Sequence, residues 1–264
     1  MQLIKIGELF GSSISTYKAR IIPLIIIMII GTGFRTITNY AASSAIVGNV
    51  RVAVEEMGIA ADDITTANFG EFLRYFPPES ILGIVVSGSV ILAAIVGIAV
   101  GIWFQGMILL TIFPYKDREA GEDGSDPRTL PEIAAESIKL WPYLALFDLI
   151  YYVGVGVGTM LLVIPGIYLA VRFSFGPLLL VIDKLKPIEA FKRSSALVKG
   201  YWWAIFGRYF LVFVLIFVGS FVLSLLGKIG AFIATVLFTP FLISYQLMLL
   251  ESVKEAKEVT APEV

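Results

Sequence analysis

The chain has 264 residues, of which 58% are hydrophobic and 16% are charged, and its formal net charge is −1. Soluble domains are about 45–50% apolar and about 25% charged, so this composition predicts an integral membrane protein. The balanced charge gives no reason to expect nucleic acid as a partner. Because the chain contains no Cys and no His, disulfides, thiolate or histidine-ligated metal sites and Ser–His–Asp catalysis are excluded, and we expect no metal and no cofactor.

The N-terminal part predicts an interfacial helix, a first span and an outer loop. Residues 3–18 repeat apolar side chains along one helical face, namely Ile6, Leu9, Phe10, Ile14 and Tyr17, which suits a helix in the membrane interface. The first span covers residues 21–40, and its helix is expected to continue outward to residue 57. An acidic outer loop follows at residues 58–79.

The second span lies within residues 81–113, an apolar run longer than the about 20 residues that cross the hydrocarbon. The helix must therefore protrude, tilt or break, and its glycines are candidate break points. Gly97 and Gly101 have the spacing of a small-residue face, whose ordinary role is close helix packing, with a hinge as the alternative. The glycine-rich run at residues 154–158 lacks the strand and the Lys-Ser/Thr ending of a nucleotide loop, so we expect the same packing role there.

The middle of the chain predicts a second interfacial helix and a hairpin of two spans. Thr129 and Glu132 have the spacing of a capping box, and the predicted helix runs from there to residue 140. The third and fourth spans cover residues 141–163 and 167–182, joined by an outer turn at Ile164-Pro165-Gly166.

The last third predicts an amphipathic helix and two more spans. Pro187 opens the helix and Gly200 closes it, the usual asymmetry of helix ends. Its apolar face is predicted as Ile188, Phe191, Ser195 and Val198, and its water face as Glu189, Lys192, Arg193 and Lys199. The fifth and sixth spans cover residues 201–226 and 229–250, and the tail after them is expected to fray.

Lys and Arg are unevenly distributed between the two sides of the predicted membrane. Fourteen of the 20 lie in segments assigned to the inside, three lie outside and three lie within spans. This bias predicts a multi-pass plasma-membrane protein with both termini in the cytoplasm. Aromatic residues typical of an interfacial belt mark the inner ends of the third and fifth spans: Trp141, Tyr143, Tyr201, Trp202 and Trp203.

These elements predict an all-α, polytopic membrane helix bundle with about six transmembrane helices and amphipathic interfacial helices. It forms a single membrane domain over residues 1–250, with a cytoplasmic linker at 114–128 and a cytoplasmic tail at 251–264. Three stretches, at about 3–113, 129–183 and 186–250, share the order of interfacial helix, outward span and returning span. All three would enter from one side, which predicts parallel repeats about an axis along the membrane normal. Alternatively, the three stretches are not repeats, and they look similar only because any interfacial helix followed by a span has this order.

A family resemblance rests on three motifs: Ile164-Pro-Gly-Ile-Tyr-Leu-Ala-Val-Arg172, Pro187-Ile-Glu-Ala-Phe-Lys-Arg-Ser194 and Leu197-Val-Lys-Gly200-Tyr-Trp-Trp203. They resemble the glycerophosphoryl diester phosphodiesterase membrane-domain family and related uncharacterised six-span prokaryotic proteins. The best match covers about 50 residues and the topology most of the chain. The resemblance implies the fold and the membrane location. In some members a catalytic barrel follows the membrane domain. Since this chain ends fourteen residues after the sixth span and lacks His, we expect no such activity.

Ionisable residues within the spans are costly and usually face a partner or a wet cavity. Asp148 and Arg208 each lie about seven residues into their spans, at about 1.5 Å per residue. This equal depth predicts an ion pair, which either locks two repeats together or lines a polar substrate site; the remaining alternative is that the two side chains make no contact. Arg172 lies near the outer turn, so it is expected to reach toward external headgroups. Lys186, Lys192, Arg193 and Lys199 give the amphipathic helix a basic face that predicts contact with anionic phospholipid, the alternative being a merely solvated face.

Three functions are compatible with these features. The first is a non-enzymatic scaffold, assembly factor or complex subunit, with a membrane protein or a second copy as its partner. The second is a transporter or lipid-handling protein with a polar site around Asp148 and Arg208. The third is an intramembrane enzyme, which without His or Cys would need carboxylates, Ser, Lys or Tyr. No convergent cluster of such residues is visible in the sequence, so we expect no catalytic residues.

Overall fold

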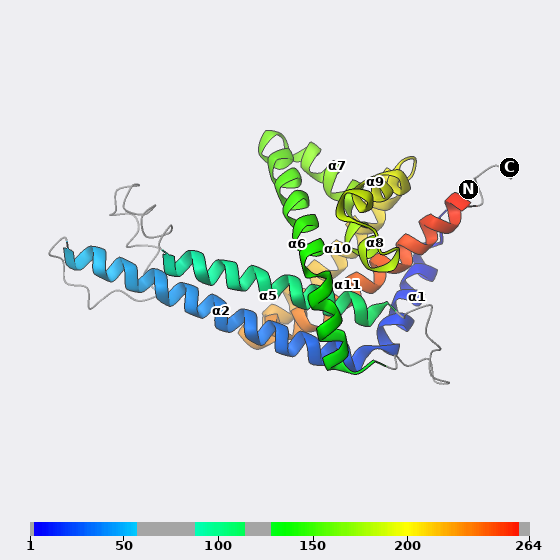
Figure 1. Ribbon diagram of the computed structural model, residues 1–264. Helices are drawn as coiled ribbons and strands as arrows, with labels where there is room; N and C mark the ends of the chain where they lie inside the picture. The colour runs from blue at the N-terminus through cyan, green and yellow to red at the C-terminus, as the bar shows by residue number, and fades with distance from the viewer. Residues whose placement is uncertain (1–2, 57–87, 114–127, 259–264) are drawn as a thin grey trace. The chain divides into compact units, whose positions relative to one another are not determined.

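The computed structural model describes residues 3–56, 88–113 and 128–258 of the chain. Within these ranges the chain forms α-helices and no strands (Figure 1). Six helical segments are long and apolar enough to cross a membrane: Ile21–Val52, Gly88–Ile112, Leu130–Leu161, Val163–Ile182, Trp202–Ser224 and Gly227–Glu258. The predicted all-α bundle with six spans is therefore confirmed, and the chain is a multi-pass integral membrane protein. The predicted loop at 58–79, the linker up to residue 127 and the end of the tail lie outside the described residues.

The helices are α1 Ile6–Ala19, α2 Ile21–Glu56, α5 Gly88–Ile112, α6 Leu130–Leu161, α7 Val163–Phe173, α8 Gly176–Ile182, α9 Pro187–Val198, α10 Trp202–Ser224 and α11 Gly227–Glu258. The chain divides into two compact units. One unit is Ile30–Gly101, and the other combines Met1–Ile29 with Ile102–Val264. The predicted division into three repeats stays a prediction.

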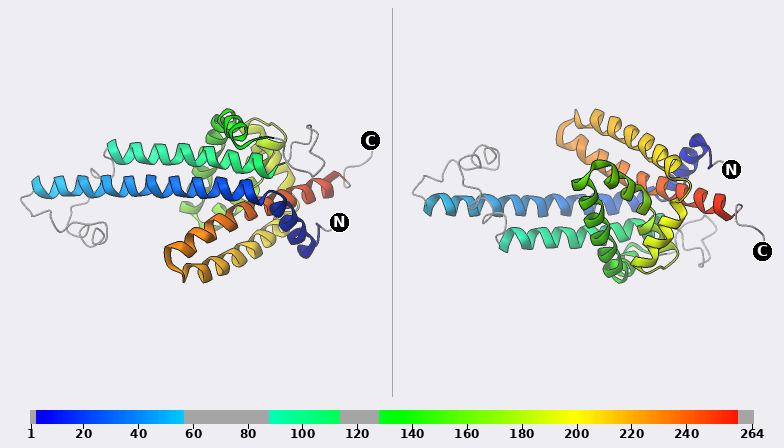
Figure 2. Two further views of the ribbon diagram at one scale, coloured as in Figure 1. Left: turned by 90° about the horizontal axis from the view of Figure 1, so that it is seen from below. Right: turned by 90° about the horizontal axis from the view of Figure 1, so that it is seen from above.

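The unit Ile30–Gly101 contains parts of α2 and α5, which run side by side in all views (Figures 1 and 2). α2 is one helix of 36 residues, so the expectation that the helix of the first span continues beyond residue 40 is confirmed, while its direction across the membrane stays a prediction. α5 is also unbroken through its glycines. A Cβ built on Gly97 would lie 3.8 Å from Thr38 Oγ1, an ordinary contact distance. A small side chain would fit there, so the structure does not show Gly97 as a site of close helix packing, and α5 has no break at this residue.

In the other unit, α1 packs on α11. Phe10 lies against Tyr245 with ring centroids 5.2 Å apart, and Leu9 is fully buried. Ile6 and Ile14 were predicted on the same face, but they are 42% and 40% exposed. The side of α1 that packs on the protein thus contains Leu9 and Ser13, whose hydroxyl donates to the Leu9 carbonyl, and the predicted position of this helix in the membrane interface stays a prediction.

α6 starts at the predicted cap, where the Thr129 backbone N–H donates to Glu132 Oε2 at 2.7 Å. The helix then continues to Leu161 with Pro142 inside it. The prediction of a separate interfacial helix ending at residue 140 is therefore wrong, since that stretch is the first part of the long α6 helix. Pro142 removes one backbone hydrogen bond, but hydrogen bonds to Trp103 hold the preceding turns in place. The Trp103 indole donates to a carbonyl of α6 at 3.0 Å, and its own carbonyl accepts from Ser137 at 2.7 Å.

The hairpin between α6 and α7 turns at Leu162, so the predicted turn at Ile164-Pro165-Gly166 is wrong. Pro165 and Gly166 lie in the first turn of α7, where proline is tolerated because its missing N–H has no partner in the helix. Gly166 packs directly on α6: a Cβ there would lie 2.9 Å from Thr159 Cα.

Only one glycine of the run at 154–158 has the expected packing role. A Cβ on Gly158 would lie 3.2 Å from the Gly166 backbone. Gly154 and Gly156 have no such neighbour within 4 Å among the described residues. Of these three glycines, Gly158 alone allows a close approach of the two helices.

The fourth span is interrupted, since α7 ends at Phe173 and α8 begins at Gly176. Pro177 follows in the first turn of α8, and its ring cannot donate a hydrogen bond to the preceding turn. A Cβ on Gly176 would lie 2.0 Å from Phe147 Cζ in α6. The lack of a side chain at Gly176 therefore lets the start of α8 lie flat on the Phe147 ring.

α9 begins at Pro187 and is followed by Gly200 with φ +91, which confirms the predicted ends. Its buried face matches the predicted apolar face in part. Val198 is buried as predicted, whereas Ile188 is 53% exposed. Ala190, Ser194 and Leu197 are buried as well, because the small side chains of Ala190 and Ser194 allow close packing on α7 and α8. The basic residues are exposed, as predicted.

α10 and α11 form an antiparallel hairpin, best seen in Figure 2. Gly227, with φ +69, lies at its turn. α11 continues through Glu258 rather than fraying after residue 250, with Ser252, Val253 and Ala256 buried. The frayed tail predicted from residue 251 is therefore wrong for its first eight residues, up to Glu258. They stay helical because α11 packs on α1 and α9.

Candidate functional site

The structure does not bring Asp148 and Arg208 together. Asp148 is buried on α6, and its polar neighbour is the Gln105 side chain of α5. The Arg208 guanidinium in α10 donates instead to the backbone carbonyls of Ala204, at 3.1 Å, and Ile4, at 2.8 Å. The described residues contain no ion pair between them. Equal depth in two helices does not fix which way each side chain points around its helix, and here the two face different neighbours.

Arg208 fastens the segment before α1 to the α10–α11 hairpin. Its guanidinium holds the Ile4 carbonyl, while the Ile4 N–H donates to Ser252 Oγ of α11 at 3.2 Å. The Tyr245 hydroxyl in turn donates to the Arg208 carbonyl at 3.1 Å. Charged donors to carbonyls are among the stronger hydrogen bonds, so Arg208 serves helix packing.

Arg172 lies at the end of α7 and contacts α9, not the outer turn. Its Nε donates to Ser195 Oγ at 2.7 Å, and the Ser194 hydroxyl donates to the Arg172 carbonyl at 2.9 Å. The guanidinium also lies 5.7 Å from the centre of the Tyr168 ring, within cation–π range. The predicted reach toward external headgroups is wrong, because the turn at Leu162 is ten residues away and α9 packs over this end of α7.

A hollow of about 470 Å³ opens beside Arg172, here called the α7–α9 pocket. Its lining comes from the end of α7, one side of α9 and the start of α10: Tyr168, Arg172, Lys192, Ser195, Ala196, Val198, Lys199, Gly200 and Trp202. Three of these side chains are cationic, and none of the described lining residues is acidic. Guanidinium, ammonium and hydroxyl donors around one hollow suit an oxyanion such as a phosphate group.

Aromatic rings form the α10 side of the pocket. Trp202 stacks on Tyr168 with ring centroids 5.7 Å apart, and its indole N–H donates to the Tyr168 carbonyl at 3.3 Å. Phe206 stacks on the other side of Trp202 at 5.2 Å. Trp202 is the first residue of α10, which is 23 residues long and so spans about 34 Å. The pocket thus lies at one end of a membrane-spanning helix, the level at which Trp and Tyr meet lipid headgroups.

The predicted headgroup residues separate into three groups. Arg172, Lys192 and Lys199 line the α7–α9 pocket. Arg193 lies on a neighbouring side of α9. Lys186 precedes α9, where its backbone N–H donates to Glu189 Oε2 at 3.3 Å, and it lines neither hollow.

Comparison of the chain with protein-family models, with curated proteins and with solved structures gave no match. The resemblance to the glycerophosphoryl diester phosphodiesterase membrane-domain family therefore stays a prediction. The candidate site rests on its own geometry.

Sequence reasoning missed the contributions of Tyr168, Ser195 and Trp202 to this site. Ser195 was placed on the apolar face of α9, and Trp202 was assigned only to the aromatic belt. One signal was available: Tyr168 and Arg172 are four residues apart, so they share a face of any helix that contains them. For metals, the described residues contain no group of three or more Asp or Glu side chains able to hold an ion.

Proposed function

We propose that this integral membrane protein binds the headgroup of an anionic phospholipid in the α7–α9 pocket and acts as a non-catalytic, lipid-handling protein. The observation that carries the proposal is the position of Arg172. Its guanidinium is oriented by Ser195 and Tyr168, and Lys192 and Lys199 line the same hollow. A planar guanidinium held in this way offers paired N–H donors to phosphate oxygens.

The level of the pocket supports a lipid ligand. The hollow begins where the apolar part of α10 begins, and the Trp202 ring lines it. A phospholipid places its phosphate at this level and its acyl chains along the helix, so acyl chains would run past the exposed apolar side chains of α10, including Phe210, Phe213 and Phe217. Each Lys or Arg near an anionic membrane surface contributes about 1 kcal/mol.

The proposal is tested by titrating short-chain phosphatidylglycerol or phosphatidylcholine onto the purified protein and counting bound lipid by native mass spectrometry. The wild type is expected to prefer phosphatidylglycerol. Lys192→Gln and Lys199→Gln each remove about 1 kcal/mol, which corresponds to about a fivefold loss of that preference. Lys139→Gln is the matched control, because Lys139 is exposed on α6 and lines neither hollow. Equal preference in all four proteins would contradict the proposal.

A scaffold, assembly-factor or complex-subunit role stays a prediction, and lipid binding is compatible with it. A transporter built around Asp148 and Arg208 has less support, because these residues face different neighbours. The lipid-handling alternative moves instead to the α7–α9 pocket.

A further inference from the structure

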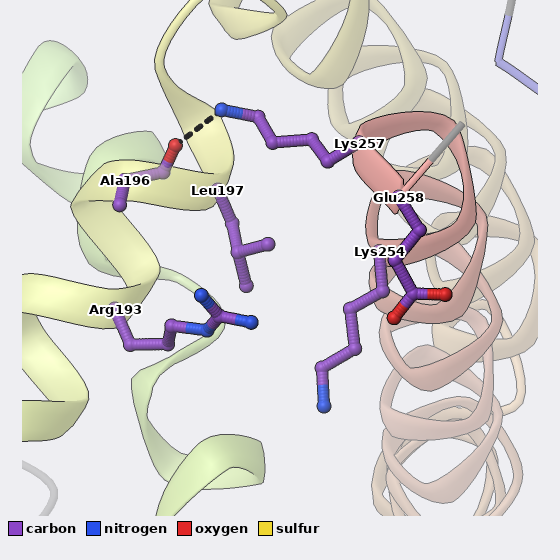
Figure 3. A pocket seen from close by; sticks show the side chains of 6 residues that line it. All are labelled: Arg193, Ala196, Leu197, Lys254, Lys257 and Glu258. Carbon is purple, nitrogen blue, oxygen red and sulfur yellow. Dashed lines mark hydrogen bonds between the residues drawn. The ribbon is translucent and has the colours of Figure 1, made fainter. Parts of the chain in front are cut away.

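A second basic hollow lies on a neighbouring side of α9, between that helix and the end of α11. Its volume is about 260 Å³. Figure 3 shows its lining: Arg193, Ala196, Leu197, Lys254, Lys257 and Glu258. We call it the α9–α11 pocket. Three cations and one carboxylate line it, and Asp183 pairs with one of the cations, Lys254, so the net charge stays positive.

Two of the three cations are held by specific contacts. Lys254 Nζ lies 2.8 and 3.1 Å from the two carboxylate oxygens of Asp183. Lys257 Nζ donates to the Ala196 carbonyl in the last turn of α9, as Figure 3 shows. That carbonyl belongs to a helix end, where a cation is favourable. The two ammonium groups are thus fixed around the hollow rather than free to move into solvent.

Arg193 differs from the two lysines in its contacts. In the part of the chain that the structure describes, no carboxylate or carbonyl pairs with its guanidinium. Figure 3 shows the guanidinium directed across the hollow toward α11. The charges of Arg193 and Lys199 both act on the Lys257 ammonium. Cations held together in this way repel one another, and a bound anion would relieve that repulsion.

The hollow lies beyond the apolar part of α11. The predicted sixth span ends at Leu250, and Lys254 to Glu258 follow within the next eight residues, or about 12 Å of helix. A group bound here is therefore farther from the hydrocarbon than a group bound beside Trp202. This position suits a water-soluble phosphate or a phosphate at the outer end of a lipid headgroup.

We propose that the α9–α11 pocket is a second anion site that binds a phosphate group through Arg193, Lys254 and Lys257. It is distinct from the α7–α9 pocket, since the two hollows share only the Ala196 side chain. Consecutive residues of α9 belong to different hollows: Lys192 lines the α7–α9 pocket and Arg193 the α9–α11 pocket. Lys139 lines neither hollow and serves as the control for both sites.

The experiment titrates inorganic phosphate onto the purified full chain in an uncharged detergent by calorimetry, at constant ionic strength. Arg193→Gln is expected to weaken phosphate binding at least tenfold, and Arg193→Lys less, because it keeps the charge without the paired donors. Glu258→Gln is expected to strengthen binding about threefold, because it removes a repelling carboxylate. Lys139→Gln, at an exposed residue that lines neither hollow, is expected to leave it within twofold of the wild type. Arg193 is exposed, so its replacement leaves the fold intact.

A second arm identifies the source of the phosphate. Phosphatidylcholine vesicles with and without 20% phosphatidylinositol 4-phosphate, whose inositol carries a phosphomonoester at the outer end of the headgroup, are mixed with the same variants, and bound protein is measured by flotation. If Arg193→Gln loses binding in the vesicle arm but not in the inorganic phosphate arm, the natural ligand is a lipid phosphate. If it loses binding to inorganic phosphate, the ligand is a free anion. Both outcomes support the site. If Arg193→Gln equals the wild type in both arms, the second site is overturned. The lipid proposal is overturned separately, by Lys192→Gln and Lys199→Gln.

Discussion

Replacing Gly176 by Ala should separate α8 from α6 and lower the stability of the whole α6–α9 region. The new Cβ would lie 2.0 Å from Phe147 Cζ and 2.2 Å from Cε2, against 3.4 Å for ordinary contact. The Phe147 ring cannot easily give way. It is fully buried and stacks on Phe191 of α9 with centroids 4.1 Å apart and an angle of 12°.

The cost follows from these contacts. Overpacking a rigid site costs about 1–3 kcal/mol, and disturbing an aromatic pair adds about 0.5–1.5 kcal/mol. We expect a total of about 2–4 kcal/mol, or a melting temperature lower by about 5–10 °C. Tryptophan fluorescence on heating in detergent measures this change.

Gly156→Ala is the matched control, because no atom among the described residues lies within 4 Å of a Cβ at Gly156. That substitution should stabilise the helix by about 0.4–1 kcal/mol through the unfolded state. Phe147→Leu should rescue part of the Gly176→Ala loss, since the smaller side chain leaves room for the new methyl group. If Gly176→Ala melts at the wild-type temperature, or if Phe147→Leu only adds to the loss, the packing argument is refuted.

Three further changes test other contacts. Gly230→Ala should lower the melting temperature by several degrees, because its Cβ would lie 1.7 Å from the Leu223 carbonyl oxygen; an unchanged melting temperature would show that this turn is looser than described. Asp183→Asn should lower the free energy of unfolding by less than about 1 kcal/mol, since its pair with Lys254 is partly exposed. A loss above about 2 kcal/mol in thermal unfolding would show that this ion pair contributes more than a surface pair does. Ser195→Ala should lower the preference for phosphatidylglycerol in the lipid titration without unfolding the chain, because the guanidinium loses its 2.7 Å partner; an unchanged preference would remove Ser195 from the site.

Much of the fold could be predicted from short-range features of the chain. Six long apolar runs identify the spans because hydrocarbon thickness sets the length of a crossing helix. The capping pair Thr129 and Glu132 and the ends of α9 at Pro187 and Gly200 depend on local backbone chemistry, so sequence alone locates them.

Helix faces and continuity could not be predicted in the same way. The buried face of α9 depends on Ala190 and Ser194, small residues whose value lies in the close approach they allow rather than in hydrophobicity. The end of α11 is helical because it packs on α1 and α9, which are distant in sequence. Such contacts exist only once the chain has folded.

The candidate site likewise depends on contacts between residues that are distant in sequence. The cations Arg172, Lys192 and Lys199 were expected to meet lipid headgroups, and this follows from charge and amphipathicity. Their gathering around one hollow depends on the early turn at Leu162, which places Arg172 against Ser195 of α9. The pairing of Asp148 with Arg208 was inferred from depth alone, and depth carries no information about direction around a helix.

The most direct test of the lipid site is an experimental structure of the protein in nanodiscs that contain phosphatidylglycerol. We predict a lipid phosphate in the α7–α9 pocket, within about 4 Å of the Arg172 guanidinium and the Lys199 ammonium, with its acyl chains along α10. A structure in which ordered anionic lipid occupies other surfaces while Arg172 contacts only Ser195 and Tyr168 would contradict the proposal.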